Sequence, residues 1–178
     1  FKPQKYAIIM VLKNRIFASI EADFSPFIKL RISLGFSQNI IMNNKKKITI
    51  IGGGAAGFFC AANLDENKFN VTILEQNQDV LQKVKISGGG RCNVSHACFD
   101  PRELVKFYPR GNKELLSVFS KFQPGDTMDW FAQRNISLKI ENDNRIFPES
   151  NSSQTIIDCF LKEVQTKNFE IKTQSVVL

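Results

Sequence analysis

The chain has 178 residues, 43% of them hydrophobic, which is enough to build one ordinary globular domain with a core. Its four cysteines, Cys60, Cys92, Cys98 and Cys159, include no C-x-x-C pair and are too sparse for a small secreted disulfide framework, so a reducing compartment and a cytoplasmic location are expected. No apolar run approaches the roughly 20 residues that a membrane-spanning helix needs, and we expect no membrane association.

The net charge of +7 is concentrated near the N-terminus. Residues 1–43 carry six basic and two acidic side chains, residues 45–47 add three lysines, and the remainder balances at fifteen of each sign. A basic face on the folded domain is therefore not indicated, and a nucleic-acid partner is only weakly supported.

The first 41 residues mix apolar and basic side chains without a sustained period. The chain opens on Phe1, and Met42 stands a few residues before the first expected strand, where a dinucleotide-binding domain usually starts. We expect residues 1–41 to be an extension outside the folded core: upstream translation, a gene-model extension or a docking arm. Glu21 and Asp23 make a transit peptide the weaker explanation, because presequences are poor in acidic residues.

From Lys45 onward the pattern predicts the start of a βαβ unit, with strand 47–51, a glycine turn, helix 55–65 and strand 70–75. The next convincing strand is 169–178, and the interval is too long for one structureless loop. It is predicted to hold a glycine loop at 87–90, helices at 101–108, 112–121, 125–134 and 153–167, and a hairpin at 136–148 closed by Pro148. Asp126 and Ser152 are candidate N-caps. The fold class expected is α/β: a Rossmann-like parallel sheet with a largely helical insertion that contains a small hairpin.

Gly52, Gly54 and Gly57 form a G-x-G-x-x-G motif directly between the first strand and the first helix. The first glycine permits the tight turn, the second lets the backbone approach a pyrophosphate, and the third lets the helix pack on the strand. The pyrophosphate then meets free N–H groups at the helix N-terminus. Eighteen residues after Gly57, Glu75 ends the second strand, where its carboxylate can accept hydrogen bonds from a ribose.

The motif leaves the choice of dinucleotide open. Glu75 favours an unphosphorylated ribose, which allows NAD or FAD and disfavours NADP at this site. A glycine-rich turn that binds nothing is the alternative interpretation. The long interval after Glu75 fits neither a simple NAD domain nor a simple dehydrogenase, and it contains a second glycine cluster, "KVKISGGGRCNVSH", at residues 83–96.

The segment "ISGGGRCN" at residues 86–93 resembles a motif of the BaiN/YhiN-like NAD(P)/FAD-dependent oxidoreductases, which include aminoacetone-oxidase-like flavoproteins. The similarity runs from about Lys47 to Leu178 and includes "FQPGDTMDWF" (122–131), "NRIFP" (144–148) and "SSQTIIDCFL" (152–161). Two departures stand out: Ser95 and His96 replace the family's usual Thr and Asn, and Asn144 replaces a Gly. Neither removes a glycine or a charge that the cofactor would need.

The resemblance implies an FAD site. Gly52, Gly54, Ala55, Ala56 and Gly57 would hold the pyrophosphate, Glu75 the adenosine ribose, and the backbone of Val177 would lie near the adenine edge. Along the flavin half it implies Lys83, Ser87, Gly88, Gly89, Gly90, Arg91, Cys92 and Asn93. A triple glycine can form a nest of N–H groups, and Lys83 and Arg91 add charge suited to a phosphate or a reduced, anionic flavin. From local sequence alone, a surface turn with solvated basic neighbours explains this cluster equally well.

Other side-chain groups have plainer interpretations. Cys92, His96 and Cys98 lack the paired spacing of a zinc site, and no metal is expected. Cys92 beside a flavin could be redox-active, but a small apolar filler fits better because no resolving cysteine accompanies it. His96 is expected to be an ordinary loop residue. The aromatic residues expected to form core are Phe119, Phe122, Trp130 and Phe131.

Members of the resembling family are more than twice as long as the matched region, so we expect a truncated, N-terminal portion of a flavoenzyme in which residues 42–178 begin the FAD-binding domain. No residue is nominated as catalytic. Three functions stay open: an FAD-dependent oxidoreductase with a reduced nicotinamide or a substrate as hydride donor; a catalytically silent dinucleotide-binding fragment that docks on another chain; and flavin-dependent reduction of an RNA base by the full-length parent. The sequence predicts neither the substrate nor the oligomeric state.

Overall fold

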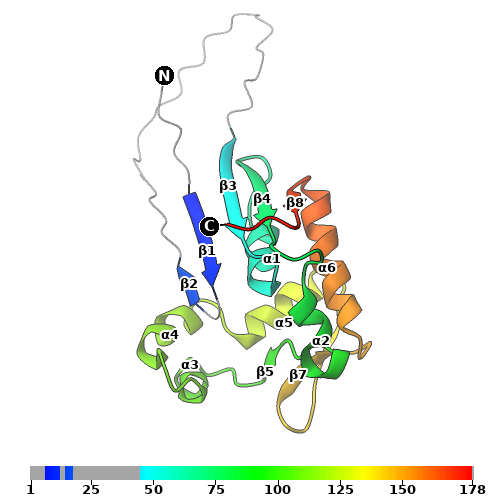
Figure 1. Cartoon of the computed structure of the whole chain (residues 1–178). Coiled ribbons are helices and arrows are strands. Elements are labelled where there is room, and N and C mark those ends of the chain that lie inside the picture. The colour runs from blue at the N-terminus through cyan, green and yellow to red at the C-terminus, as the bar shows by residue number, and fades with distance from the viewer. Residues whose placement is uncertain (1–6, 13–14, 18–44, 178) are drawn as a thin grey trace, which may run out of the picture. The chain divides into compact units, whose positions relative to one another are not determined.

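The computed structural model describes residues 7–12, 15–17 and 45–177. The chain divides into two compact units. The sheet unit comprises the chain up to Gln78 together with Lys167–Leu178, and the insertion unit comprises Asp79–Thr166. Both are drawn in Figure 1, and each is described here by itself.

The sheet unit is built on three parallel strands, β3 (Lys46–Ile51), β4 (Phe69–Leu74) and β8 (Glu170–Lys172), with α1 (Ala55–Ala62) connecting the first two. In register, Ile50 lies beside Ile73, which lies beside Ile171. A strand, a helix and a parallel neighbouring strand form the βαβ unit that the sequence predicts. The parallel sheet and the βαβ start confirm the α/β, Rossmann-like fold class.

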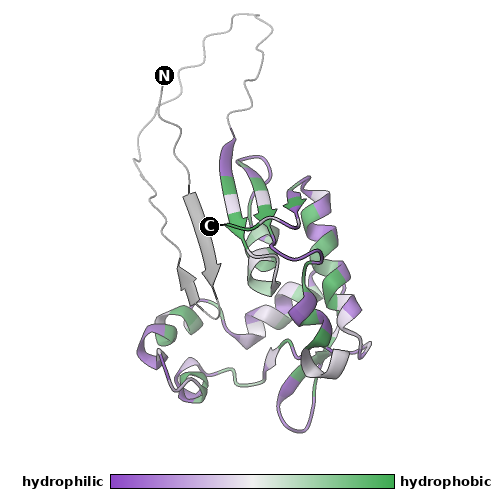
Figure 2. Cartoon of the chain, in the orientation of Figure 1, coloured by the Kyte–Doolittle hydropathy of each residue, from purple (hydrophilic) through white to green (hydrophobic). Residues whose placement is uncertain are grey.

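Alternation along β3 and β4 produces the core of this unit. Ile50 and Ile73 are fully buried, and Phe58 of α1 is fully buried as well. Figure 2 shows hydrophobic residues alternating with paler or hydrophilic ones along β3, as a strand with one face against a helix requires. The C-terminal end of α1 is closed by Lys167, whose Nζ donates to the carbonyls of Ala62 and Leu64, each at 2.7 Å. A lysine there also complements the negative end of the helix dipole.

Two short strands from the N-terminal segment extend this sheet. β1 (Ala7–Leu12) pairs in parallel with β3, and β2 (Arg15–Phe17) pairs antiparallel with β1, which makes the strand order β2-β1-β3-β4-β8. The remainder of residues 1–41 lies outside the described residues. The domain boundary at residue 42 stays a prediction.

Deletion of residues 1–41 tests that boundary. We expect the melting temperature to change by only a few degrees, because β3, α1 and β4 form the βαβ unit without any contribution from residues 1–41. Thermal unfolding followed by circular dichroism measures it. A drop of ten degrees or more would show that the β1–β3 pairing belongs to the stable core.

The insertion unit combines helices with a small antiparallel sheet. Its strands are β5 (Ser95–His96), β6 (Leu138–Ile140) and β7 (Arg145–Pro148), in the order β5-β7-β6. Its helices are α2 (Gln82–Gly90), α3 (Pro101–Leu104), the 3₁₀ turn η1 (Val105–Phe107), α4 (Asn112–Phe119), α5 (Pro124–Ala132) and α6 (Ser153–Thr166).

The core of the insertion unit is aromatic. Phe147 of β7 is fully buried, and the rings of Trp130 and Phe131 on α5 pack against Phe160 on α6 with centroids 5.7 and 5.9 Å apart. Arg134 lies over the Trp130 ring at 3.6 Å and pairs with Glu163 of α6 at 3.1 Å. These contacts tie α5 to α6.

Several local predictions need correction. The N-cap of α5 is Gln123, and Asp126 is the third helical residue, whose side chain accepts from the Gln123 N–H at 2.8 Å. The last strand covers only residues 170–172, and the chain from Thr173 onward leaves the sheet. Phe119 and Phe122 are partly exposed and do not belong to the core, unlike Trp130 and Phe131. Ser152 does accept a hydrogen bond from the Gln154 N–H at 3.3 Å, as a capping residue would.

The other predicted elements have close counterparts. Four elements were not anticipated: the strands β1 and β2, the right-handed start of α2 and the two-residue strand β5. His96, expected in a loop, lies in β5. Among the residues that the structure describes, no helix combines the length and apolar character needed to cross a bilayer.

Candidate functional site

The glycine turn of the sheet unit lies between the C-terminal end of β3 and the N-terminus of α1. Gly52 has a φ of +105°, a conformation that side chains strongly disfavour, and its N–H donates to Leu74 O at 2.7 Å. The turn therefore starts where the two parallel strands end. This edge is where open α/β sheets bind ligands.

The third glycine of the motif fixes the helix against the strand. A Cβ added to Gly57 would collide with the carbonyl oxygen of Gly52 and would also approach Ile50 Cγ2 to 3.3 Å. No side chain fits there, so the packing role predicted for Gly57 agrees with the geometry.

The second glycine faces open space. A Cβ built on Gly54 meets no atom within 4 Å, and Gly54, Ala55 and Ala56 are exposed. In the described part of the chain no group accepts a hydrogen bond from the Ala55 or Ala56 N–H, and the first turn of α1 holds no acidic residue. The N-terminus of an eight-residue helix is thus left open beside a backbone without side chains, which suits an anionic group.

Glu75 is buried at the end of β4 and braces the turn. Its Oε2 accepts from the Gly53 N–H at 2.8 Å, and its Oε1 accepts from Asn77 N and Nδ2 at 2.9 and 2.7 Å. A carboxylate has about four acceptor positions, so one remains for a further donor such as a ribose hydroxyl. The sequence analysis did not identify Asn77 as a hydrogen-bond partner of Glu75. The available signal was an amide side chain two residues after the acidic residue.

The pKa of Glu75 lies below its ordinary value of 4.5. Burial acts to raise it, but the hydrogen bonds donated by Asn77 and Gly53 together outweigh that effect. The ionised carboxylate consequently stabilises the folded chain.

Glu75→Gln is expected to lower the free energy of unfolding at neutral pH by about 1–3 kcal/mol, because an amide nitrogen cannot accept the bonds that one carboxylate oxygen accepts. A group whose folded pKa is depressed stabilises fully above its unfolded pKa and loses that contribution as the pH falls through the folded pKa. The difference in the free energy of unfolding between Glu75→Gln and the wild type should therefore become smaller below about pH 4.5. Urea unfolding across this range measures it. Equal stability of the two proteins at neutral pH would contradict the bracing role.

The segment after β8 lies beside Glu75. The Glu75 N–H donates to Lys172 O, the Ser175 N–H donates to Glu75 O, and the Gln174 N–H donates to Asn77 O, at 2.8, 2.8 and 3.0 Å. Val177 follows two residues later and is half exposed. The sheet unit thus brings together the glycine turn, Glu75 and the segment that ends at Val177, all of which the sequence predicted for the adenosine diphosphate half of the site.

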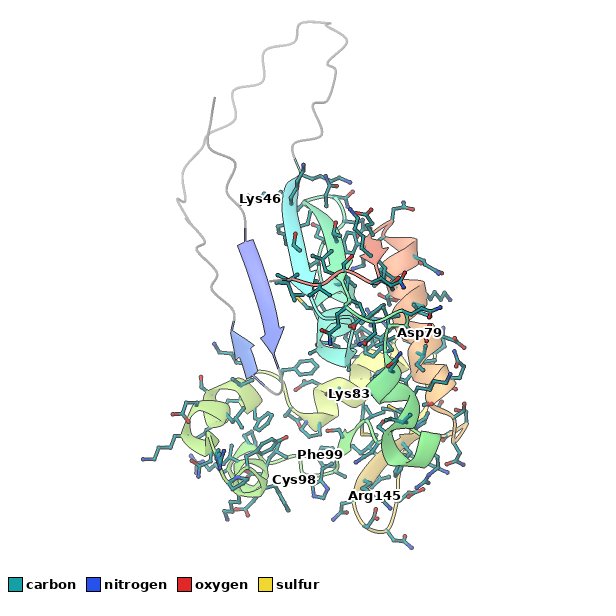
Figure 3. All side chains as sticks on the ribbon, viewed as in Figure 1. Lys46, Asp79, Lys83, Cys98, Phe99 and Arg145 are labelled. Atoms are coloured by element: carbon teal, nitrogen blue, oxygen red, sulfur yellow. The ribbon has the colours of Figure 1, made fainter. Side chains whose placement is uncertain are left out.

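The second glycine cluster, in the insertion unit, forms a left-handed turn. α2 leaves right-handed geometry at Ser87, and Gly88, Gly89 and Gly90 have φ values of +57°, +69° and +84°. A Cβ on Gly88 would lie 2.7 Å from the Phe147 ring, whereas one on Gly89 would meet nothing within 4 Å. Gly88 is therefore needed for packing, and Gly89 and Gly90 are exposed. Figure 3 marks Lys83, an exposed side chain of α2.

Arg91 and its neighbours are engaged within the insertion unit. Arg91 pairs with Glu141 at 2.6 Å and lies 4.0 Å from the centroid of the Phe147 ring. Glu141 offsets its charge and holds the guanidinium in place, which the sequence could not show. With its amide nitrogen donating, Asn93 bonds to Ser95 O at 2.9 Å and to Ile146 O at 3.3 Å.

Cys92 is 6% exposed and adopts a φ of +62°. Burial raises the pKa of its thiol, with a smaller opposing effect from Ser87, so the nucleophilic thiolate is disfavoured. The geometry agrees with a packing role for this cysteine. Within the described residues no group of three metal-ligating side chains comes together.

A family profile described as the HI0933-like protein Rossmann domain matches residues 46–178. Among curated proteins, the chain is 29% identical over 124 residues to the ribosomal RNA dihydrouridine synthase of Escherichia coli strain K12, covering 70% of this chain and 30% of that protein. It is 28% identical over 130 residues to the 3-dehydro-bile acid delta(4,6)-reductase of Clostridium scindens, covering 71% of this chain and 31% of that protein. The chain thus spans about a third of the length of these relatives.

Among solved structures, the chain resembles THI4 of Thermovibrio ammonificans with a TM-score of 0.44 and 9% identity, over 71% of this chain and 38% of that one.

Proposed function

The chain belongs to the HI0933-like family, and on that basis we propose that it is the FAD-binding portion of a flavin-dependent oxidoreductase. The observation that carries the proposal is the turn at Gly54, where exposed N–H groups and the N-terminus of α1 face open space. A pyrophosphate is the group that such a turn accommodates.

In this proposal the sheet unit holds the adenosine diphosphate half of the cofactor. The pyrophosphate accepts hydrogen bonds from the Ala55 and Ala56 N–H groups across Gly54, while Gly52 and Gly57 set the backbone. Glu75 offers its remaining acceptor position to the ribose, and the backbone of Val177 takes the adenine edge. FAD, when bound, supplies hydride and electron transfer.

The insertion unit contributes the residues for the flavin half: Lys83, Ser87, Gly88, Gly89, Gly90, Arg91, Cys92 and Asn93. The exposure of Lys83, Gly89 and Gly90 supports direct contact for these three. The ion pair with Glu141 and the burial of Cys92 support a positioning role for Arg91 and Cys92.

For the whole protein we propose reduction of a carbon–carbon double bond conjugated to a carbonyl, with NAD(P)H as the candidate electron donor. Both relatives carry names for such reductions, of a uridine and of a 3-dehydro-bile acid. Reduction of an RNA base is the form of this activity that the first relative favours. Binding of the whole protein to RNA with an affinity that falls steeply with salt would support it, and no binding at low salt would overturn it.

Cofactor identity tests the proposal. We expect the whole protein to purify yellow and the chain to bind FAD in preference to NADH, because Glu75 and the second glycine cluster both fit FAD. Fluorescence titration with each nucleotide measures the preference. Colourless protein that binds NADH tightly and ignores added FAD would indicate a dehydrogenase. A chain that binds neither nucleotide would contradict the proposal.

A further inference from the structure

Helix α4 carries an apolar stripe that the insertion unit covers only in part. The stripe has the i, i+3, i+4, i+7 spacing of one helix face and consists of Leu115, Val118, Phe119 and Phe122. The Phe122 N–H donates to Val118 O at 3.0 Å, so the helical turn continues to the end of the stripe. Such a stripe normally packs into a core. Among the described residues, however, none of the eight in α4 is buried.

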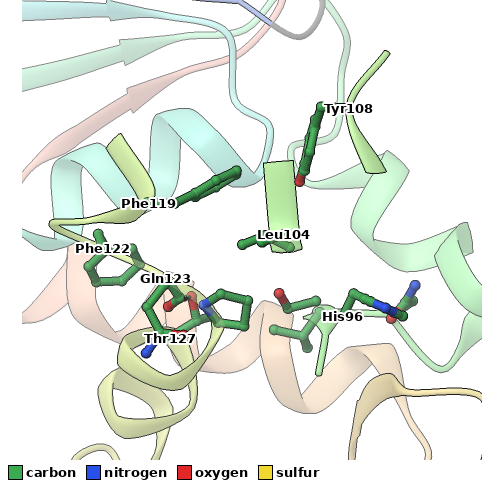
Figure 4. Close-up of a pocket in the computed structure, with 11 residues that line it drawn as sticks. His96, Leu104, Tyr108, Phe119, Phe122, Gln123 and Thr127 are labelled. Atoms are coloured by element: carbon green, nitrogen blue, oxygen red, sulfur yellow. Dashed lines mark hydrogen bonds between the residues drawn. The ribbon is translucent and has the colours of Figure 1, made fainter. Parts of the chain in front are cut away.

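One side of the stripe packs within the insertion unit, and the other side is exposed. The Phe119 ring lies 5.3 Å from the Tyr108 ring between centroids, and both line a pocket together with Phe122 (Figure 4). Val118 is 50% exposed, Phe122 is 38% exposed, and Phe107 of the neighbouring η1 is 63% exposed. Exposed apolar side chains that gather on one face indicate a contact surface for another protein. We call the part formed by Leu115, Val118 and Phe122 the α4 face.

Charged side chains of opposite sign border the α4 face at its two ends. Glu114 lies in the first turn of α4, and Lys121 lies seven residues later, about two turns along the same side of the helix. Neither has an ion-pair partner in the described part of the chain, whereas Lys106 of η1 is paired with Glu103 at 2.7 Å. In an antiparallel pair of α4 helices, each Glu114 meets the partner's Lys121, while a parallel pair places like charges at the same level.

We infer that the α4 face binds a second copy of this chain, in a symmetric dimer whose two α4 helices pack antiparallel. Val118 and Phe122 of each copy cover the same residues of the other, and two equivalent ion pairs border the contact. The two border charges balance, which matches a second copy better than a strongly acidic or strongly basic partner. The inference goes beyond the proposed function and does not depend on FAD.

Sedimentation velocity of the chain tests the dimer. The chain should shift from a monomer of 20.2 kDa to a dimer as its concentration rises from about 5 to 500 µM, because a contact of this small size gives a weak complex. Val118→Asp should abolish the shift, since it places a carboxylate in the apolar contact of both copies at once. Circular dichroism should show the same helix content in this variant as in the wild type.

A charge exchange tests the antiparallel arrangement. Glu114→Lys should weaken the dimer about tenfold, because one substitution alters both equivalent ion pairs. Lys121→Glu should weaken it to a similar extent, and the double variant should associate within about threefold of wild type. Glu149→Lys is the matched control: it makes the same change of charge at an exposed site of the insertion unit outside α4 and should have no effect.

A chain that stays monomeric at about 500 µM would overturn the inference. A dimer that survives Val118→Asp would do the same, because it would form through another surface. If the double variant associates no better than the single variants, the antiparallel pairing is wrong. None of these measurements involves FAD, so their failure would leave the proposed FAD site intact.

Discussion

Gly54→Val should reduce the affinity of the chain for FAD by at least about a hundredfold while leaving the fold intact. The space over Gly54 is empty in the structure, so a branched side chain enters it without a clash and then occupies the position of the pyrophosphate. Hydrogen bonds to a charged group are worth about 1.5–3 kcal/mol each, and loss of two corresponds to roughly a hundredfold or more.

Flavin fluorescence quenching measures this affinity, and circular dichroism with urea unfolding reports the fold. Gly54→Ala is the matched control: its single methyl group should weaken FAD binding less than valine does. An affinity of Gly54→Val within about threefold of wild type, a change of roughly 0.7 kcal/mol, would mean that the turn is only structural.

Gly57→Ala, unlike Gly54→Val, should destabilise the fold itself. The added Cβ meets the backbone oxygen of Gly52, which cannot rotate away, and Ile50 Cγ2 at 3.3 Å. Overpacking of this kind costs about 1–3 kcal/mol, and a rigid backbone neighbour places the cost at the upper end or beyond.

Urea unfolding of Gly57→Ala and Gly54→Ala separates the two roles of the motif. Gly54→Ala should unfold within about 1 kcal/mol of wild type, because its Cβ meets nothing and its φ of −90° suits any residue. Equal stabilities of the two variants would show that α1 can shift off β3, and the packing role of Gly57 would be wrong.

The βαβ start was predictable because its signals are local. Alternating apolar residues mark β3 and β4, and the glycine spacing marks the turn between them. The right-handed start of α2 was missed because only five residues precede the kink at Ser87, too few to establish a helical period. β5 was missed because a two-residue strand exists only through its pairing with β7. The last strand was predicted too long because "SVVL" has high β propensity, whereas in the described part of the chain the pairing of β8 with β4 ends at Lys172.

The local geometry of the candidate site was also predictable in part, while its ligand stays a prediction. Gly52, Gly54, Gly57 and Glu75 carry a spacing with a known mechanical purpose, and the geometry around each agrees with it. The partners that hold the second cluster were not predictable. Glu141 reaches Arg91 across 50 residues, and Phe147 packs on Gly88 across 59, since tertiary contacts leave no mark in local sequence. Phe119 and Phe122 were assigned to the core because helical spacing does not distinguish a buried face from the wall of a pocket.

The backbone amides of Ala55 and Ala56 report whether the turn holds the pyrophosphate. In a titration of ¹⁵N-labelled chain, FAD should shift both amides strongly, and ADP alone should reproduce these shifts because it carries the pyrophosphate without the flavin. Riboflavin, which has no phosphate, should leave them unchanged. FAD that binds, as judged by fluorescence quenching, while the Ala55 and Ala56 amides stay at their free positions would contradict the account.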